Sequence, residues 1–416
     1  MDKDNIFLGQ LPEMKFGNEL VRALSVFPEY DNSICQENQA VRLMALSDIY
    51  KIYVPSQMSF EIYSKLYLAL LHSLQKKTTK ISIIQRNQNH KAIRNNEYNG
   101  IIGGSDSFTI IGTSGIGKSS AITRAIKLIT ENRIIEIKKP FMKIIPCVVV
   151  QCPFDSSVKG LLLEVLRKVD EELESSYYEN AVKNRTTTDM LIGVVSQIAL
   201  NHIGLLIVDE IQNVVNSKNG KSLVGSLTQL INNSGISICM VGTPESIIFF
   251  EQAMHLARRS LGLQYNAMNY DAYFQSFCKV VFNYQYLKKR TEITAAIMEW
   301  LYEHSAGVVS VVVSLIHDAQ EIAILTGTEE LNLETLREAY QQRMNLLHDY
   351  IQPNIIQSRQ TSTIKKKKPV DNLLKKQRNS EEKQCSIHEI VQQAQQQNID
   401  VVLLLKEYYP VIEVAI

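Results

Sequence analysis

The sequence lacks an excess of charge of one sign. Its 416 residues include 44 Lys and Arg against 43 Asp and Glu, so the net charge is +1. This balance excludes a histone-like or protamine-like polycation, and any surface that binds nucleic acid has to be local. Apolar residues make up 45% of the chain and charged residues 21%, which is typical of a globular protein rather than a disordered one.

Cysteines and long hydrophobic runs are also scarce. The six cysteines are scattered and form no C-x-x-C pair, which excludes a disulfide framework and any recognisable zinc site and indicates a reducing compartment. No apolar run approaches the length of a membrane span, so we expect no membrane contact. The opening residues, MDKDNIFLGQ, hold two aspartates and no apolar core, so we expect no signal peptide.

The pattern of residues 100–286 predicts the fold class. Short apolar runs rich in β-branched residues alternate there with helical stretches, which is typical of an α/β domain with a parallel sheet covered on both faces. We therefore predict a five-stranded parallel sheet. Its expected strands are Phe108–Ile111, Ile144–Gln151, Leu205–Val208, Ile236–Val241 and Val280–Tyr286.

The flanking regions differ from this core in composition. We expect a helical N-terminal region with a basic connector over residues 1–99, in which Phe60, Tyr63 and Leu70 belong to one apolar helical stripe. We expect residues 287–350 to form a helical lid, in which Gly307 precedes an apolar helix. We expect residues 351–416 to form a flexible, Lys-rich tail that ends in a short helix. This tail fits a DNA-binding arm, a docking segment for a protein partner, or a dispensable extension.

The strongest motif is G-x-x-x-x-G-K-S directly after the first predicted strand. Its glycines let backbone N–H groups surround a phosphate chain, Lys118 reaches the β- and γ-phosphates, and Ser119 offers a hydroxyl to Mg²⁺. The motif predicts binding of ATP and Mg²⁺. The residues expected to hold the nucleotide here are Gly112, Thr113, Ser114, Gly115, Ile116, Gly117, Lys118, Ser119 and Ser120.

Two adjacent carboxylates, Asp209 and Glu210, follow the predicted strand Leu205–Val208. Ligands of α/β sheets bind at the carboxyl ends of the strands. Asp209 is therefore expected to hold the hydrated Mg²⁺ together with Ser119. Glu210 is expected to polarise the attacking water as general base.

Two further motifs complete an ATPase constellation. Thr243 follows the strand Ile236–Val241 and is the candidate that reads the γ-phosphate, although it also suits the opening of the next turn. Arg258 and Arg259 follow a helical stretch, and one of them is the candidate arginine finger that reaches a neighbouring subunit.

Together these motifs and the helical lid resemble an AAA+ ATPase. Five further stretches carry a closer resemblance: Cys152–Leu161, Val208–Asn213, Val241–Glu245, Ala257–Gly262 and Ser305–Leu315. With them the chain resembles the TnsC family of ATP-dependent transposition regulators and its TniB relatives. The resemblance covers about residues 100–350, and the short segment Gly17–Leu24 resembles the front of the same family. One departure from AAA+ enzymes in general is that Val308, Val309 and Ser310 stand where a second sensor arginine is expected.

This resemblance implies a role beyond ATP hydrolysis. TnsC-like proteins form rings or filaments on duplex DNA when ATP is bound and link a target selector of the TnsD or TniQ type to transposase subunits of the TnsA and TnsB type. It also implies a bacterial cytoplasmic protein that associates with the nucleoid. The alternative that the residues leave open is a P-loop ATPase that switches or remodels protein partners without depending on DNA.

The residues that contact DNA are less sharply indicated than the ATP site. If a ring forms, the start of the helix after the second strand is expected to line its pore, which favours Lys159. Each candidate is also compatible with an ordinary solvated side chain, and such contacts would be to phosphates, with little sequence preference. The candidates are Lys159, Lys183, Arg185, Lys218 and Lys221.

Overall fold

A six-stranded sheet organises the protein. The computed structural model describes residues 11–77, 107–131, 134–138, 141–214, 220–247 and 262–343. Within them the strand order is β2-β3-β4-β5-β1-β6, and all neighbours run parallel except β2, which pairs antiparallel with β3. The strands are β1 (Phe108–Gly112), β2 (Ile135–Lys138), β3 (Phe141–Gln151), β4 (Ile203–Asp209), β5 (Ser237–Gly242) and β6 (Leu263–Tyr265).

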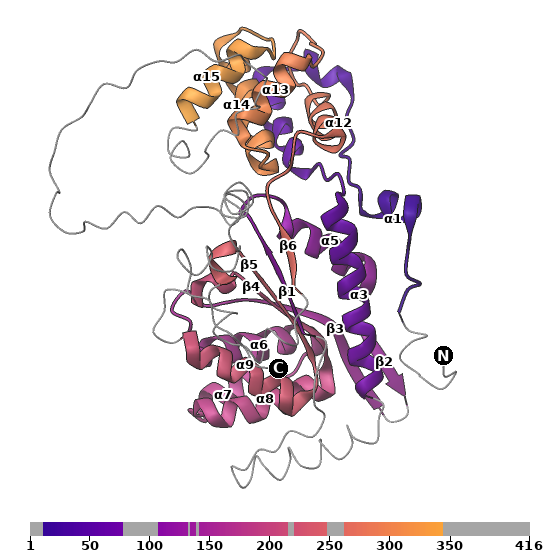
Figure 1. Cartoon of the computed structure of the whole chain (residues 1–416), viewed down its shortest axis with the longest axis vertical. Coiled ribbons are helices and arrows are strands. Elements are labelled where there is room, and N and C mark those ends of the chain that lie inside the picture. Colours follow the sequence, from indigo (N-terminus) through magenta and orange to yellow (C-terminus); the bar gives the residue numbers. More distant parts are fainter. Residues whose placement is uncertain are drawn as a thin grey trace, which may run out of the picture. The chain divides into compact units, whose positions relative to one another are not determined.

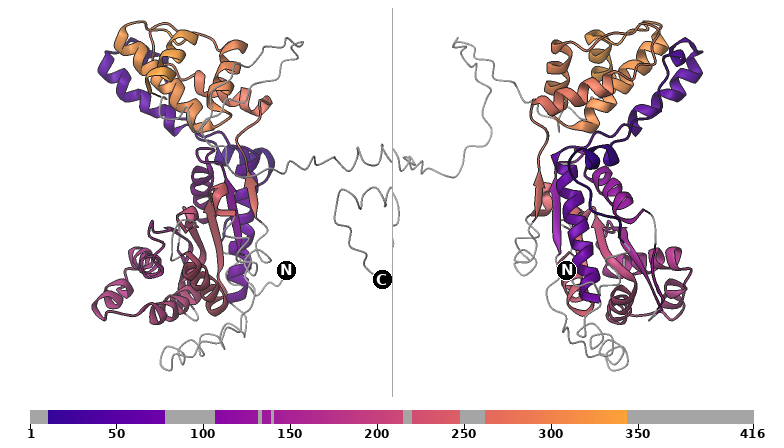
Figure 2. Two further views of the ribbon diagram at one scale, coloured as in Figure 1. Left: turned by 60° about the vertical axis from the view of Figure 1, so that its left-hand side comes forward. Right: turned by 90° about the vertical axis from the view of Figure 1, so that its right-hand side faces the viewer.

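Helices cover both faces of the sheet (Figure 1; Figure 2). On one face lie α3 (Gln57–Lys77) and α5 (Lys118–Thr130). On the other lie α6 (Val158–Leu173), α8 (Thr188–His202) and α9 (Gly220–Ser234), with the short α7 (Tyr177–Lys183) after α6.

Strand β4 shows why two layers of helices are needed. Leu205 and Ile207 join the core beneath α3 and α5, whereas Leu206 and Val208 join the core beneath α6 and α8. Successive side chains of a strand point to opposite faces, so a strand that is apolar throughout must be covered on both sides. The α/β fold class expected from the sequence is confirmed.

The predicted number of strands was wrong by one, and one predicted strand is absent because its first residues end a helix. Val280–Tyr286 was expected to be a strand, but its first three residues are the end of α12 (Ala272–Phe282) and the rest of it forms no strand. Phe274, Cys278 and Val281 bury one helical face, and the Asp271 side chain accepts a hydrogen bond from the Phe274 N–H at the helix start. The fifth parallel strand is instead the three-residue β6, and β2 adds a sixth strand by folding back on β3.

The helices that follow the last strand in the sequence form a second hydrophobic core. It is formed by α12, α13 (Ala295–Ser305), α14 (Val309–Thr326) and α15 (Leu333–Arg343), and it also includes residues of η3 (Leu46–Lys51) from the N-terminal region. Helix α12 packs in this core although it lies inside the range 100–286 predicted for the ATPase core. Within the described residues, α14 alone is long and apolar enough to cross a membrane, but more than half of it is buried among these helices.

The N-terminal region is helical, as its pattern indicates. It contains α1 (Gly17–Leu24), η2 (Asn32–Gln36), α2 (Gln39–Ala45) and η3 ahead of the long α3. In α3, Tyr63 and Leu70 are buried as predicted, whereas Phe60 is only partly buried because the buried stripe is centred on Ile62 and Leu66. Lys77 ends α3 and donates hydrogen bonds to the Ala199 and Leu200 carbonyls.

A buried ion pair joins the N-terminal region to the lid. The guanidinium of Arg42, which is fully buried, donates to both carboxylate oxygens of Glu329 at 2.6 Å and to the Tyr286 carbonyl at 3.0 Å. These hydrogen bonds hold the pKa of Glu329 below its usual range. Their stabilisation is therefore complete above the ordinary pKa of Glu, near 4.3, and is lost as the pH falls through the lowered value.

Replacing Arg42 by Met should destabilise the protein by about 3–5 kcal/mol, because it leaves the Glu329 carboxylate buried without its partner. The double variant Arg42→Met/Glu329→Leu should recover part of that loss. Urea unfolding of the parent and both variants at neutral pH measures the difference. Equal stability of the parent and Arg42→Met would show that the ion pair does not hold the lid.

Candidate functional site

The phosphate-binding loop connects β1 to α5. Lys118 is the first residue of α5, so the free N–H groups at the helix start point toward the loop. Gly115 has a φ of +79°, and a Cβ there would lie 2.3 Å from the Ser310 hydroxyl. Only glycine fits this position, because a side chain would be strained and would also push the lid helix α14 away.

The loop opens into a cavity of about 260 Å³ at the carboxyl ends of β1, β4 and β5. The cavity brings together the loop, the two carboxylates and the threonine that the sequence singled out. The lining residues are Ser114, Gly115, Gly117, Lys118, Ser119, Ser120, Asp209, Glu210, Gln212, Gly242, Thr243 and Ser310.

Lys118 is the positive charge of this cavity. Its Nζ donates to the Gly112 carbonyl at 2.6 Å and to the Thr113 carbonyl at 2.8 Å. Burial lowers the pKa of Lys118, while the carboxylates of Asp209, Glu210 and Glu245 oppose that shift. A phosphate chain would replace the two carbonyls with charged acceptors, which form stronger hydrogen bonds.

Ser119 and Asp209 provide a site that fits Mg²⁺. The Ser119 hydroxyl donates to Asp209 Oδ2 at 3.2 Å, so the first turn of α5 and the end of β4 meet. The other oxygen, Asp209 Oδ1, accepts from the Glu210 N–H at 2.8 Å, which fixes the orientation of the carboxylate. This pair of oxygen ligands beside a phosphate-binding loop is the kind of site that Mg²⁺ shares with a nucleotide.

The side chain of Gln212 lies between Glu210 and Thr243 and is hydrogen-bonded to both. Glu210 is exposed to the cavity and has a φ of +58°. Gln212 donates through Nε2 to Glu210 Oε2 and accepts through Oε1 from the Thr243 N–H at 3.3 Å. Thr243 also precedes the short helix η5 (Pro244–Ser246), and its side-chain hydrogen bond lowers the pKa of Glu245.

A second cavity of about 200 Å³ adjoins the phosphate cavity. Gly115, Gly117, Ser120 and Ser310 line both. Its other walls are mostly apolar or aromatic and come from the start of α3 and the segment before it, from α12 and the segment before it, and from α14. They include Tyr50, Ile52, Tyr53, Val54, Met58, Met268, Tyr273, Phe277, Val309 and Val313.

The sequence did not indicate this second cavity. Tyr53 and Val54 lie more than 50 residues before the loop, and no motif marks them. They reach the loop because the Val26–Tyr53 bridge and the Tyr273 hydroxyl, which donates to the Val54 carbonyl at 2.9 Å, hold the segment in place.

The lid touches the phosphate-binding loop directly. The Ser310 N–H donates to the Gly115 carbonyl at 3.0 Å, and the Ser310 side chain faces both cavities. Ser310 is one of the three residues that, in the sequence analysis, stand where a second sensor arginine is expected in AAA+ enzymes.

Several predicted residues lie elsewhere or outside the described residues. Lys159 is exposed in the first turn of α6, Arg185 is exposed after α7, and Lys183 forms an ion pair with Glu179 at 3.1 Å. Arg258, Arg259, Lys218 and the tail over residues 351–416 lie outside the described residues. Lys221 belongs to α9, and the position of its side chain is likewise not described.

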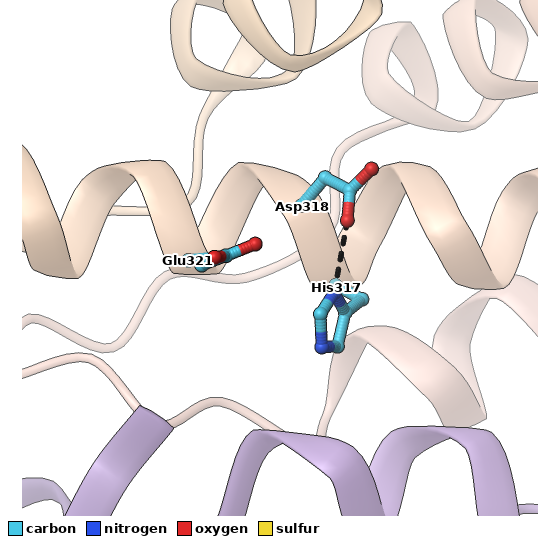
Figure 3. Close-up of side chains that lie close together, drawn as sticks. All are labelled: His317, Asp318 and Glu321. Atoms are coloured by element: carbon cyan, nitrogen blue, oxygen red, sulfur yellow. Dashed lines mark hydrogen bonds and ion pairs between the residues drawn. The ribbon is translucent and has the colours of Figure 1, made fainter. Parts of the chain in front are cut away.

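A separate group of possible metal ligands lies on α14. Figure 3 shows His317 and Asp318 joined by a hydrogen bond, at 2.9 Å, with Glu321 on the same helix. Glu321 forms an ion pair with Arg343 at 3.3 Å, and the His317 ring packs against Tyr50 with 4.7 Å between centroids. These contacts account for the side chains, and we assign no metal to them.

Comparison with known proteins identifies the core. Residues 102–247 match the family model described as "AAA domain". Over these residues the chain is similar to an AAA domain. The match covers the phosphate-binding loop, Asp209, Glu210 and Thr243.

Solved structures resemble the chain at low identity. The origin recognition complex of Drosophila bound to DNA has 13% identity and a TM-score of 0.44, with 79% of this chain and 69% of that chain covered. ORC1 of Aeropyrum pernix in complex with DNA has 12% identity and a TM-score of 0.41, with 66% and 68% covered. Domain III of Thermotoga maritima DnaA has 15% identity and a TM-score of 0.34, with 66% and 95% covered. Similarities of this size carry no functional argument. No curated protein matches the chain.

Replacing Lys118 by Ala should weaken binding of ATP by about tenfold to a hundredfold, because one charge-assisted hydrogen bond to phosphate is worth about 1.5–3 kcal/mol. Titration with a fluorescent ATP analogue measures the loss. Lys127→Ala, on the exposed side of the same helix, is the matched control. If both variants bind the analogue as the parent does, the cavity is not a phosphate site.

Proposed function

We propose that this AAA domain hydrolyses ATP and that the chain is an ATP-dependent, DNA-binding regulator of DNA transposition. The observation that carries the ATPase part is the cavity in which Lys118, Ser119, Asp209 and Glu210 converge. The TnsC-like motifs of the sequence support the transposition part, and they also suggest a homo-oligomer that links a target selector to a transposase.

The two adjoining cavities suit the two ends of ATP. The polar cavity holds Lys118 and the start of α5 for the phosphates, and the apolar cavity offers Tyr53, Tyr273 and Phe277 to a flat base. Because Ser310 and Gly115 line both, the ribose would pass beside the contact between the lid and the loop. Bound ATP would thus touch the AAA core, the lid and the N-terminal segment together.

Hydrolysis requires a water aligned with the γ-phosphate. In this proposal the oxygen of that water bonds to the γ-phosphorus while Glu210 takes a proton from the water. The bond between the γ-phosphorus and the β-phosphate oxygen breaks, which releases ADP and phosphate. Lys118 stabilises the charge that develops on the phosphate oxygens. Mg²⁺, held by Ser119 and Asp209, would neutralise the β- and γ-phosphate oxygens when bound.

A series of hydrogen bonds connects this site to the proposed DNA contact. The Cys152 N–H donates to the Asp209 carbonyl at 2.8 Å, and the Asn213 side chain donates to the Cys152 carbonyl at 2.9 Å. The Ser156 hydroxyl donates to the Asn213 carbonyl at 3.0 Å, one residue before the cap of α6. A shift of the segment after Asp209 would therefore move the helix start that carries Lys159.

Replacing Glu210 by Gln should leave ATP binding intact and slow hydrolysis by about a hundredfold or more, because general bases contribute factors of 10²–10⁴. The variant should then stay on duplex DNA in the presence of ATP and Mg²⁺, whereas the parent dissociates as ATP is consumed. Fluorescence anisotropy of labelled DNA follows this, with ADP and a non-hydrolysable ATP analogue as references. Glu172→Gln, on the exposed side of α6, is the control.

Two results would contradict this proposal. Turnover by Glu210→Gln at the rate of the parent would remove Glu210 from the role of base. Binding of DNA that is absent, or equal with the ATP analogue, ADP and no nucleotide, would leave an ATPase that acts on protein partners.

Replacing Lys159 by Ala should lower the salt dependence of DNA binding, because each phosphate contact contributes about 0.9 to the slope of log K against log salt. Binding with the ATP analogue is measured at several salt concentrations. Lys279→Ala, exposed on α12, should keep the slope of the parent. An unchanged slope in Lys159→Ala would exclude this helix start from the DNA interface.

A further inference from the structure

The segment that follows Glu210 holds a side chain that no motif assigns. Gln212 lies in η4 (Ile211–Val214) and is half-buried in the wall of the phosphate cavity. Its amide is used at both ends: Nε2 donates to the Glu210 carboxylate, and Oε1 accepts from the Thr243 backbone N–H at 3.3 Å. One planar group thus joins the end of β4 to the end of β5.

These two strands already run side by side, since Val208 pairs with Met240. The ladder ends there, so the residues that do the chemistry lie beyond its last pair. Glu210 has three rotatable side-chain bonds and an exposed carboxylate, and the sheet alone does not fix where that carboxylate points. The hydrogen bond from Gln212 engages one of its oxygens and leaves the other free to accept from a water.

A glycine makes room for this bridge. A Cβ at Gly242 would lie 2.6 Å from Ile211 Cγ2 and 3.2 Å from Gln212 Oε1. Gly242 immediately precedes Thr243, so its missing side chain is what lets η4 approach β5 closely enough for the amide to reach the Thr243 N–H. The hydrogen bonds of Gln212 and the space at Gly242 are separate observations, and both indicate a specific contact between η4 and the end of β5.

We propose that Gln212 is a positioning residue that holds the carboxylate of the base Glu210 at a fixed place relative to Thr243. The carboxylate that activates the water is then aligned with the end of β5, which also borders the phosphate cavity. This inference rests on the proposed ATPase function and deepens it. Gln212 acts through Glu210 and makes no bond to the reacting atoms. Removing its amide should therefore lower the rate of the chemical step and leave the affinity for ATP unchanged.

The first test replaces Gln212 by Met, which keeps the length of the side chain and removes both hydrogen bonds. The kcat for ATP hydrolysis should fall on the order of tenfold to a hundredfold, with the Kd for a non-hydrolysable ATP analogue within about twofold of the parent. Gln264→Met, exposed on β6 of the same sheet, is the matched control. A kcat equal to that of the parent would overturn the assignment. A fall in kcat accompanied by an equal loss of affinity would also overturn it, because it would indicate a general structural role.

The second test uses the space at Gly242. Gly242→Ala should reduce kcat by pushing Ile211 and Gln212 away, and it should cost little more in a protein that already carries Gln212→Met. Fully multiplicative effects of the two substitutions would show that the glycine serves another purpose. If the parent itself hydrolyses no ATP, the proposed function fails, and this inference fails with it. A normal parent with a normal Gln212→Met variant overturns the inference alone.

Discussion

The site depends on parallel strands that end at one edge of the sheet. Strand β1 lies between β5 and β6, and β5 separates it from β4. This order sets the phosphate-binding loop next to the end of β5 and within reach of the end of β4. The 3.2 Å hydrogen bond between Ser119 and Asp209 closes that arrangement, because it joins the first turn of α5 to the last residue of β4.

The rest of the molecule supports this edge from outside the sheet. The lid reaches the loop through Ser310 and Gly115, and the N-terminal region reaches it through Tyr53. The buried pair of Arg42 and Glu329 holds those two outer parts to each other. A nucleotide in the two cavities would therefore meet three parts of the chain that are already joined, which is the arrangement required if its state is to be passed on.

Residues buried in the middle of the sheet made much of the fold predictable. Strands β1, β4 and β5 are covered on both faces and β3 is covered along part of its length, so they leave continuous apolar runs in the sequence. The edge strand β6 has three residues and the hairpin strand β2 four, which is too short for such a signal. Val280–Tyr286 misled the prediction because only its first three residues are helical. The capping residue Asp271 and the other buried residues of that helix, from Phe274 to Cys278, precede the run.

The same distinction applies to the site. Lys118, Ser119, Asp209 and Glu210 stand in local patterns that the sequence displays, and the fold brings them into one cavity. Gln212, Ser310 and Tyr53 were not assigned roles, because their contacts arise only when distant segments are packed together. The polar bridge through Gln212 in particular depends on the missing side chain of Gly242, which lies 30 residues further along the chain.

The measurement that tests the central claim most directly is the steady-state rate of ATP hydrolysis by the full chain, with and without Mg²⁺ and with and without duplex DNA. The account predicts turnover that requires Mg²⁺ and rises when duplex DNA is added. Turnover that ignores Mg²⁺, or no turnover under any of these conditions, would contradict the assignment of this cavity as an ATPase site.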